Sequence, residues 1–244
     1  MTSEPAGQEK LLEVHDLGAG YGGMPALRNI SMEVRRAEIV ALVGSNGAGK
    51  TTLLRALSRV IPCTGTINFN GFDLVPMTPD EVFRTGLVHV PEGRQLFDRM
   101  TVEDNLLMGA YRRADKAAIA RDLDRVYSLF VRLRERRSQL AGSMSGGEQQ
   151  MCALARGLIA RPKLLMIDEM SLGLAPVVVE QLMDVLQVIR KEGVTVLLVE
   201  QDVNLALSAA GRAYVMDTGS IVRSGRAKDL IDDPAVREAY LGLA

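Results

Sequence analysis

The side chains best suited to chemistry in this 244-residue sequence form one continuous run that can bind phosphate. Eight residues fit the phosphate-binding loop pattern G-x-x-x-x-G-K-[ST], and they are Gly44, Ser45, Asn46, Gly47, Ala48, Gly49, Lys50 and Thr51. Glycines let the backbone curl so that its N–H groups point at a polyphosphate. We expect Lys50 to reach the β- and γ-phosphates and the Thr51 hydroxyl to bind Mg²⁺. The alternative is a glycine-rich turn that contains a lysine by chance.

The elements on either side of this loop favour the nucleotide site over the chance turn. Residues 39–43 are an apolar run typical of a buried strand, and residues 52–57 have a helical pattern that starts at Thr52. A strand, a loop and a helix in this order are the context that the pattern requires. The dipole of the helix adds positive potential beside the phosphates, so Thr52 is also expected to contact the nucleotide.

Two acids supply the second part of the predicted site. The apolar run over residues 164–167 is followed directly by Asp168 and Glu169. A carboxylate at the end of a parallel strand beside a phosphate loop can hold Mg²⁺, which suits Asp168. Glu169 is placed to face the γ-phosphate and polarise an attacking water, so it is the predicted catalytic base. The alternative is that both acids cap the helix that follows.

A third motif, Ser145, Gly146 and Gly147, lies between the first two and begins a helical pattern. A serine hydroxyl and glycine N–H groups at the start of a helix form an anion site, although a flexible loop has a similar composition. The segment from Met144 to Gln150 closely resembles the signature of ATP-binding cassette ATPases, and the three motifs also follow one another in the order that this family has. In that family the signature binds the γ-phosphate of ATP held by a second subunit. The resemblance, which extends over residues 11–225, therefore implies that two cassettes enclose two ATP molecules.

The resemblance also implies the architecture. It predicts an α/β fold with a P-loop NTPase (RecA-like) core, an antiparallel β subdomain and a helical subdomain. We expect a single cassette domain over residues 10–244, with the core at approximately 10–90 and 147–244. The helical subdomain with the signature would occupy residues 91–146, and residues 1–9 are expected to be a disordered lead-in.

Local patterns predict further elements. Antiparallel strands are expected at residues 11–14 and 30–34, with a glycine-rich turn over 18–23 between them. A helical pattern runs from Thr101, which has a capping partner in Asp104, to about residue 137. Its many arginines favour a solvated face over a basic docking site. The other expected elements are strands at 65–71, 87–90 and 194–199, an Asn-Gly turn at 70–71, and helices at 149–160, 177–190 and 234–241.

Several positions take their role only from the resemblance. Tyr21 falls where the family stacks an aromatic ring on adenine. Glu92 replaces a glutamine that senses Mg²⁺ and nucleotide while contacting the transmembrane partner, so it is a candidate nucleotide and Mg²⁺ ligand. Gln201 replaces the switch histidine and is the second predicted catalytic residue. Its amide can hydrogen-bond the γ-phosphate but cannot carry a positive charge. The loop over residues 171–174 falls where cassettes contact each other across the dimer.

These departures, together with the segment Ser171–Pro176, resemble the LivF-type ATPase of bacterial branched-chain amino acid importers. This resemblance implies ATP and Mg²⁺ as cofactors and ATP hydrolysis coupled to transport. It implies a second cassette as partner (a heterodimer, or a homodimer in isolation), two transmembrane permeases and, indirectly, a periplasmic or extracellular solute-binding protein. The chain would then lie peripherally on the cytoplasmic face of the inner membrane. The alternatives are an importer ATPase for urea, amides or another solute, a regulatory cassette without transport, and a small-molecule kinase.

Composition agrees with this class of protein. The net charge of −1 argues against nucleic acid as the main partner. Cys63 and Cys152 are expected to be unpaired thiols, because no Cys/His cluster has metal-ligand spacing. No apolar run reaches the 18 or more residues that a transmembrane helix needs, so a membrane connection would come through a partner.

Overall fold

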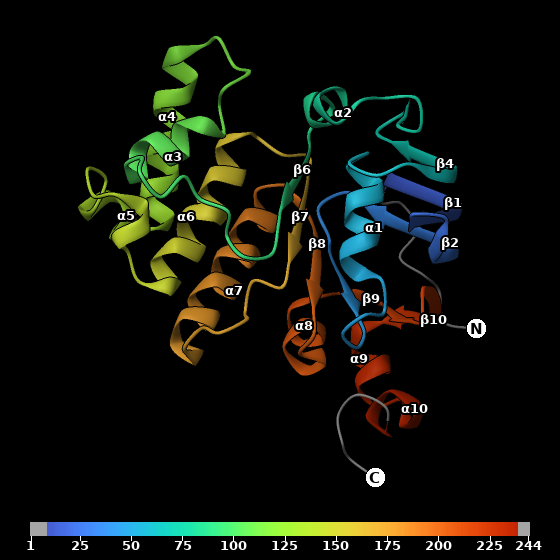
Figure 1. Cartoon of the computed structure of the whole chain (residues 1–244). Coiled ribbons are helices and arrows are strands. Elements are labelled where there is room, and N and C mark those ends of the chain that lie inside the picture. Colours follow the sequence, from blue (N-terminus) through green and yellow to red (C-terminus); the bar gives the residue numbers. More distant parts are fainter. Residues whose placement is uncertain (1–8, 239–244) are drawn as a thin grey trace.

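The computed structural model describes residues 9–238, in which two β-sheets and a layer of helices lie side by side (Figure 1). Of the predicted lead-in over residues 1–9, only Glu9 is among the described residues. The helix predicted at 234–241 is shorter where it can be described, because α10 spans Pro234–Val236 and residues 239–241 lie outside the described range.

The central sheet has six strands, and its parallel strands position the predicted site. In spatial order the strands are β10 (Ser220–Arg226), β9 (Arg212–Asp217), β3 (Ile39–Val43), β8 (Thr195–Glu200), β7 (Leu164–Asp168) and β6 (Leu87–Val90). All are parallel except β10, which pairs antiparallel with β9. Every residue of β3, β7 and β8 is buried because both faces of the sheet are covered. The carboxyl ends of these strands meet at one edge, which brings their loops together.

The second sheet is antiparallel, as predicted, but its first turn is shorter than predicted. Its strands, in spatial order, are β2 (Met24–Arg35), β1 (Lys10–Tyr21), β4 (Cys63–Phe69) and β5 (Phe72–Asp73). The turn predicted over residues 18–23 is wrong in extent, because β1 continues to Tyr21 and the chain reverses at Gly22 and Gly23 (φ +56° and +84°). Gly20 instead permits close strand contact, since a Cβ there would lie 2.1 Å from the Met24 carbonyl oxygen. The Asn-Gly turn at 70–71 is confirmed, with both φ angles positive.

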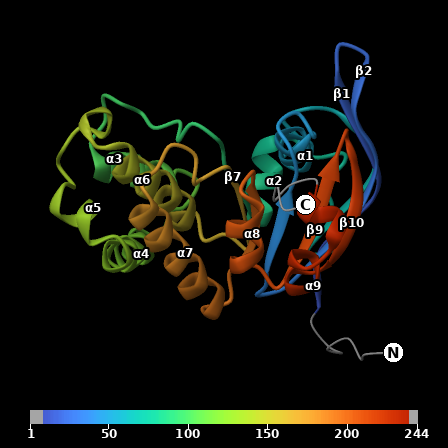
Figure 2. The same ribbon diagram turned by 90° about the horizontal axis from the view of Figure 1, so that it is seen from below.

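The helices cover both faces of the central sheet. Helix α1 (Lys50–Leu57) lies between the two sheets, and α6 (Gly146–Ile159) and α7 (Pro176–Lys191) lie on the opposite face (Figures 1 and 2). Buried apolar side chains fill both interfaces. The remaining helices are α2 (Pro79–Thr85), α3 (Val102–Met108), α4 (Lys116–Leu129), α5 (Val131–Glu135), the short 3-10 turn η1 (Ala141–Ser143), α8 (Val203–Ala209) and α9 (Ala227–Ile231).

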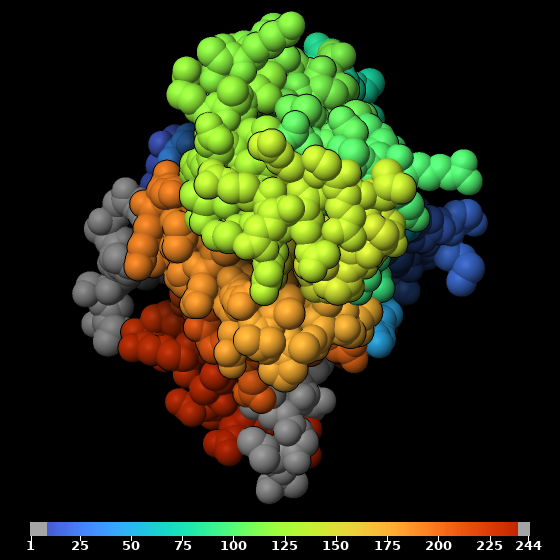
Figure 3. All heavy atoms as spheres, turned by 90° about the vertical axis from the view of Figure 1, so that its left-hand side faces the viewer, coloured from blue at the N-terminus to red at the C-terminus, as the bar shows by residue number. Residues whose placement is uncertain are grey.

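The helical stretch predicted from Thr101 to about residue 137 is interrupted twice. Helix α3 has the predicted capping box of Thr101 and Asp104, but it ends at Gly109, and buried Phe130 adopts a non-helical conformation between α4 and α5. These helices, in green and yellow-green, occupy the upper part of the face that Figure 3 presents, and the orange segment that contains α7 lies below them. Several arginines of this segment pair with acids; the pairs are Arg112–Asp80, Arg113–Asp122 and Arg125–Glu192.

The described residues 9–238 contain neither a disulfide nor a helix that could span a membrane. Within this range the cysteines Cys63 and Cys152 are free thiols. None of its helices combines the length and the apolar character needed to span a bilayer.

Candidate nucleotide-binding site

The phosphate loop connects β3 to α1 and leaves the start of α1 open. Gly49 precedes the helix with φ +105°, a left-handed conformation that glycine adopts readily. A Cβ on Gly44 would lie 2.2 Å from the Met216 carbonyl oxygen, so the loop packs directly against the end of β9. Within residues 9–238 no side chain caps α1, and its first turn contains no acid. The first N–H groups of this helix are therefore available to phosphate.

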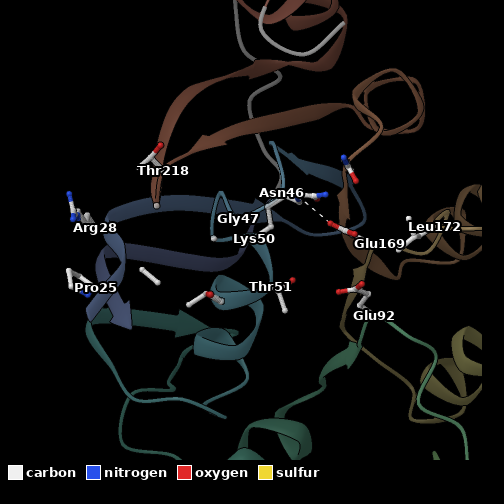
Figure 4. Close-up of a pocket in the computed structure, with 15 residues that line it drawn as sticks. Pro25, Arg28, Asn46, Gly47, Lys50, Thr51, Glu92, Glu169, Leu172 and Thr218 are labelled. Carbon is white, nitrogen blue, oxygen red and sulfur yellow. Dashed lines mark ion pairs between the residues drawn. The ribbon is translucent and has the colours of Figure 1, made fainter. Parts of the chain in front are cut away.

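The Lys50 amine lies inside the loop. Its side chain is only 4% exposed, and Nζ donates hydrogen bonds to the carbonyl oxygens of Gly44 (2.9 Å) and Ser45 (3.2 Å). It also forms an ion pair with the Glu169 carboxylate at 3.3 Å, drawn as the dashed line in Figure 4. A buried ammonium held at a helix N-terminus gives the cleft a fixed positive charge for a polyphosphate.

Asp168, at the end of β7, has the properties expected of a cation ligand. It is 1% exposed, and neither carboxylate oxygen has a hydrogen-bond partner among the described residues. Burial raises the pKa of this carboxyl to about 6; the nearby Thr51 hydroxyl and the Lys50 charge oppose the increase, and the charges of Glu169 and Glu92 add to it. A buried carboxylate without partners is costly, and a divalent cation would remove that cost. Asp168 and the Thr51 hydroxyl therefore fit Mg²⁺, with the other ligands from phosphate and water.

No set of three or more His, Cys, Asp or Glu side chains suited to a metal ion occurs in residues 9–238. A magnesium ion held mainly by one carboxylate, a hydroxyl and phosphate oxygens does not require one. The alternative interpretation of the two acids is wrong, because helix α7 begins only at Pro176 and is not capped by either of them.

Glu169 is held at the cleft by its backbone. Its φ is +47°, and its N–H donates to the Val199 carbonyl oxygen of β8 (2.9 Å). A positive φ is unusual for glutamate, and such conformations concentrate at functional sites. The side chain is 12% exposed and faces Lys50.

The loops enclose a cleft of about 550 Å³, shown in Figure 4. Most of the predicted residues of this region line it; they are Asn46, Gly47, Gly49, Lys50, Thr51, Thr52, Glu92, Glu169 and Gln201. Six further residues line the cleft without having been predicted to do so, and they are Pro25, Ala26, Arg28, Leu172, Thr218 and Gly219. The volume suits a small ligand such as a nucleotide.

The turn at Thr218 and Gly219 is the most informative of the residues that were missed. The Gly219 N–H donates to the Ala48 carbonyl oxygen (2.9 Å), and the Gly219 carbonyl oxygen accepts from the Arg28 N–H (2.8 Å). The turn between β9 and β10 therefore supports the phosphate loop from behind. The only sequence signal was a Thr-Gly turn between two short alternating segments, which does not reveal its neighbours.

Not every predicted residue lies on the wall of the cleft. Gly44, Ser45 and Ala48 form the loop backbone but do not line the cleft. Asp168 lines the neighbouring hollow instead, together with Thr51 and Glu92. Tyr21 is 44% exposed at the end of β1, and its hydroxyl oxygen accepts a hydrogen bond from Arg55 Nη1 (3.4 Å) instead of lining the cleft. Adenine stacking by Tyr21 stays a prediction.

The signature segment lies at the start of α6, away from this cleft. Ser145 is the N-cap: its Oγ accepts from the Glu148 N–H (3.3 Å), and its own N–H donates to the Glu148 carboxylate (2.9 Å). Glu148 also pairs with Arg136 at 2.7 Å. None of Ser145, Gly146 and Gly147 lines the nucleotide cleft of its own chain, and anion binding by these residues stays a prediction.

Comparison with known proteins identifies this arrangement. Residues 27–171 match the family described as ABC transporter. The chain belongs to the ABC transporter family. It is 46% identical to the high-affinity branched-chain amino acid transport ATP-binding protein BraG of Pseudomonas aeruginosa, over 95% of this chain and 100% of that protein. It is also 31% identical to the probable branched-chain amino acid transport ATP-binding protein LivF of Archaeoglobus fulgidus, over 96% and 99%.

Solved structures agree on the fold of the cassette. The ADP conformation of an ATP-binding cassette of an ABC transporter matches with a TM-score of 0.86 at 24% identity, over 96% of this chain and 99% of the other. An ATP-binding subunit of an ABC transporter matches with a TM-score of 0.82 at 29% identity, over 95% and 96%. The predicted family and the predicted α/β cassette fold are confirmed.

Proposed function

We propose that this cassette hydrolyses ATP to power an importer of branched-chain or related hydrophobic amino acids. The observation that carries the proposal is the group formed by Lys50, Asp168 and Glu169 beside the open N-terminus of α1. Two relatives of this chain, BraG and LivF, are described as branched-chain amino acid transport ATP-binding proteins, the latter as a probable one. The chain itself need not contact the solute.

The residues of the cleft suggest how hydrolysis proceeds. The phosphates of ATP compete with Glu169 for Lys50, because the amine is the cation nearest to that carboxylate at 3.3 Å. Once released from this pair, Glu169 can accept a proton from a water that attacks the γ-phosphate. Gln201 donates an amide hydrogen bond to the γ-phosphate. Mg²⁺, held by Thr51 and Asp168 with Glu92 nearby, would neutralise the charge that develops on the phosphate oxygens.

The signature segment makes the site dependent on a second cassette. Ser145 and Gly147 would contact the γ-phosphate of the partner's ATP, and the partner's signature would contact the ATP bound here. The partner is a different cassette in the transporter, although two copies of this chain can also pair. Two permeases and a solute-binding protein complete the importer, which places this chain peripherally at the cytoplasmic face of the membrane.

Glu92 gives the cleft a route to the permeases. It lines the nucleotide cleft and also a second hollow of about 590 Å³, which Phe83, His89 and Gln95 help to form. A permease segment seated in that hollow would contact the loop that carries a candidate Mg²⁺ ligand. Nucleotide state and permease position would then influence each other through Glu92.

The decisive experiment is purification of this chain from its own membranes in mild detergent, followed by reconstitution in vesicles. We expect two permeases and a second cassette to copurify, and branched-chain amino acids with their binding protein to stimulate ATP hydrolysis. Glu169→Gln should reduce turnover by about a hundredfold or more while ATP still binds. Stimulation only by urea or an amide would mean that the importer transports that compound and not branched-chain amino acids. Recovery without permeases would favour the regulatory alternative.

A further inference from the structure

The loops that follow β7 and β8 are joined by a buried contact outside the predicted site. Both oxygens of the Glu200 carboxylate accept hydrogen bonds from one residue, Ser171. The Ser171 N–H donates to Oε1 (3.1 Å), and the Ser171 hydroxyl donates to Oε2 (2.7 Å). Glu200 is 1% exposed, so this contact is shielded from water.

Residues of the nucleotide cleft lie on both sides of this contact. Gln201 follows Glu200 directly, Leu172 follows Ser171 directly, and both line the cleft. A second hydrogen bond, from the Glu169 N–H to the Val199 carbonyl oxygen (2.9 Å), joins the same two segments at the ends of β7 and β8. The predicted base, the predicted γ-phosphate ligand and the loop over residues 171–174 are therefore held as one unit.

The fold alone does not explain why a glutamate occupies the buried position 200. Burying a carboxylate is costly, and no Lys or Arg pairs with Glu200 in the part of the chain that the structure describes. The charges of two neighbouring acids, Glu169 and Asp202, have the same sign as that of Glu200 and increase the cost. Helix α8 does not depend on Glu200, because Asp202 caps it by accepting from the Leu205 N–H (3.0 Å). An apolar residue would fill the same position at lower cost.

We propose that Glu200 is a positioning residue that fixes Gln201 relative to the loop over residues 171–174. The inference rests on the proposed ATPase function. A second cassette that presses on this loop would shift Ser171, and the two hydrogen bonds to Glu200 would transmit the shift to Gln201. ATP bound in this cleft would thereby respond to contact with the partner through the Ser171–Glu200 bonds.

The test compares variants in the reconstituted complex. Glu200→Ala should lower kcat by about tenfold to a hundredfold, the scale expected when a group that orients the reactants is misplaced. The KM for ATP should stay within about twofold, because Lys50 and the phosphate loop are unchanged. Glu200→Gln should recover most of kcat, since its amide can accept from the Ser171 N–H and donate to the Ser171 hydroxyl. Ser171→Ala removes one of the two bonds and should give an intermediate kcat.

Asp202→Asn is the matched control. It removes a negative charge next to Gln201 but keeps the cap of α8, so its kcat should equal that of the wild type. Thermal unfolding of each variant separates positioning from folding, and Glu200→Gln with Ser171→Ala provides the test if Glu200→Ala does not fold. A wild-type kcat in Glu200→Ala, or equal losses in Glu200→Gln and Glu200→Ala, would overturn the inference alone. An inactive wild-type complex would overturn the proposed function with it.

Discussion

Helices α1 and α6 both begin after a short segment of glycine and serine, yet their N-termini differ. Helix α1 begins at Lys50 with no acid in its first turn, and the described chain provides it with no side-chain cap. Helix α6 has a complete capping box, and Glu148 places a carboxylate in the first turn of the helix. The first is ready to bind a strong anion by itself, whereas the second is partly satisfied by its own chain. This difference suits a cassette that holds its own ATP firmly and its partner's ATP only on contact.

Lys50→Ala should break the stronger of the two sites. The variant loses the buried ammonium that would contact the phosphates, so ATP affinity should fall by about 10- to 150-fold, the range for a hydrogen bond to a charged group. Isothermal titration with ATP in the presence of Mg²⁺ measures this directly. Thermal unfolding without nucleotide serves as the control, because Lys50 also donates to Gly44 and Ser45. Unchanged affinity would contradict the assignment of the phosphate loop.

Ser145→Ala should affect the weaker site without changing the stronger one. The loss of the N-cap should cost about 1 kcal/mol of folding stability. Turnover of the paired cassettes should fall by about tenfold, as expected when one hydrogen bond to a charged group is lost, while the ATP affinity of the single chain stays unchanged. Thr101→Ala is the matched control, because it removes the same kind of capping box from α3. If both variants lose turnover equally, Ser145 has only a structural role.

Glu200, at the end of β8, should make the stability of the cassette depend on pH. Burial raises the pKa of Glu200 to about 7, and the charges of Glu169 and Asp202 add to the increase. Because this folded-state pKa lies above the unfolded value, stability is lost as pH rises through about 7. Between about pH 6.5 and 8 the loss should be about 1 kcal/mol, or about 2–4 °C in Tm. Thermal unfolding across this range should show a smaller decrease for Glu200→Gln, and an identical decrease would assign it to other groups.

Glu148→Gln should make the weaker site more like the stronger one. Glutamine preserves the capping box, but the variant lacks the negative charge that opposes an anion at the start of α6. ATP-dependent pairing of two cassettes should strengthen by about two- to fivefold, which corresponds to the usual effect of one charge at a helix end. Sedimentation in the Glu169→Gln background would measure it. Weaker pairing would mean that the Glu148–Arg136 ion pair contributes more than the lost repulsion.

The contrast also shows what the sequence could predict. The phosphate loop and the two acids at the end of β7 were predictable because each depends on neighbours within a few residues. The supports from Thr218, Gly219 and Glu200 were not, because they arise only when distant segments meet in the sheet. Gly18 and Gly20 led to a different error, because they were assigned to a turn although they lie within β1. The same residue type serves turns and close strand contacts, and local pattern does not distinguish them.

The position of β3 has a consequence for the order of events during synthesis. This strand leads into the phosphate loop, but both of its neighbours in the sheet, β8 and β9, are made about 150 residues later in the chain. The Gly219–Ala48 bond forms later still. At about 5–20 residues per second, the loop leaves the ribosome many seconds before the strands that support it. A nascent cassette therefore acquires its full capacity for ATP only when nearly all of its chain has been translated.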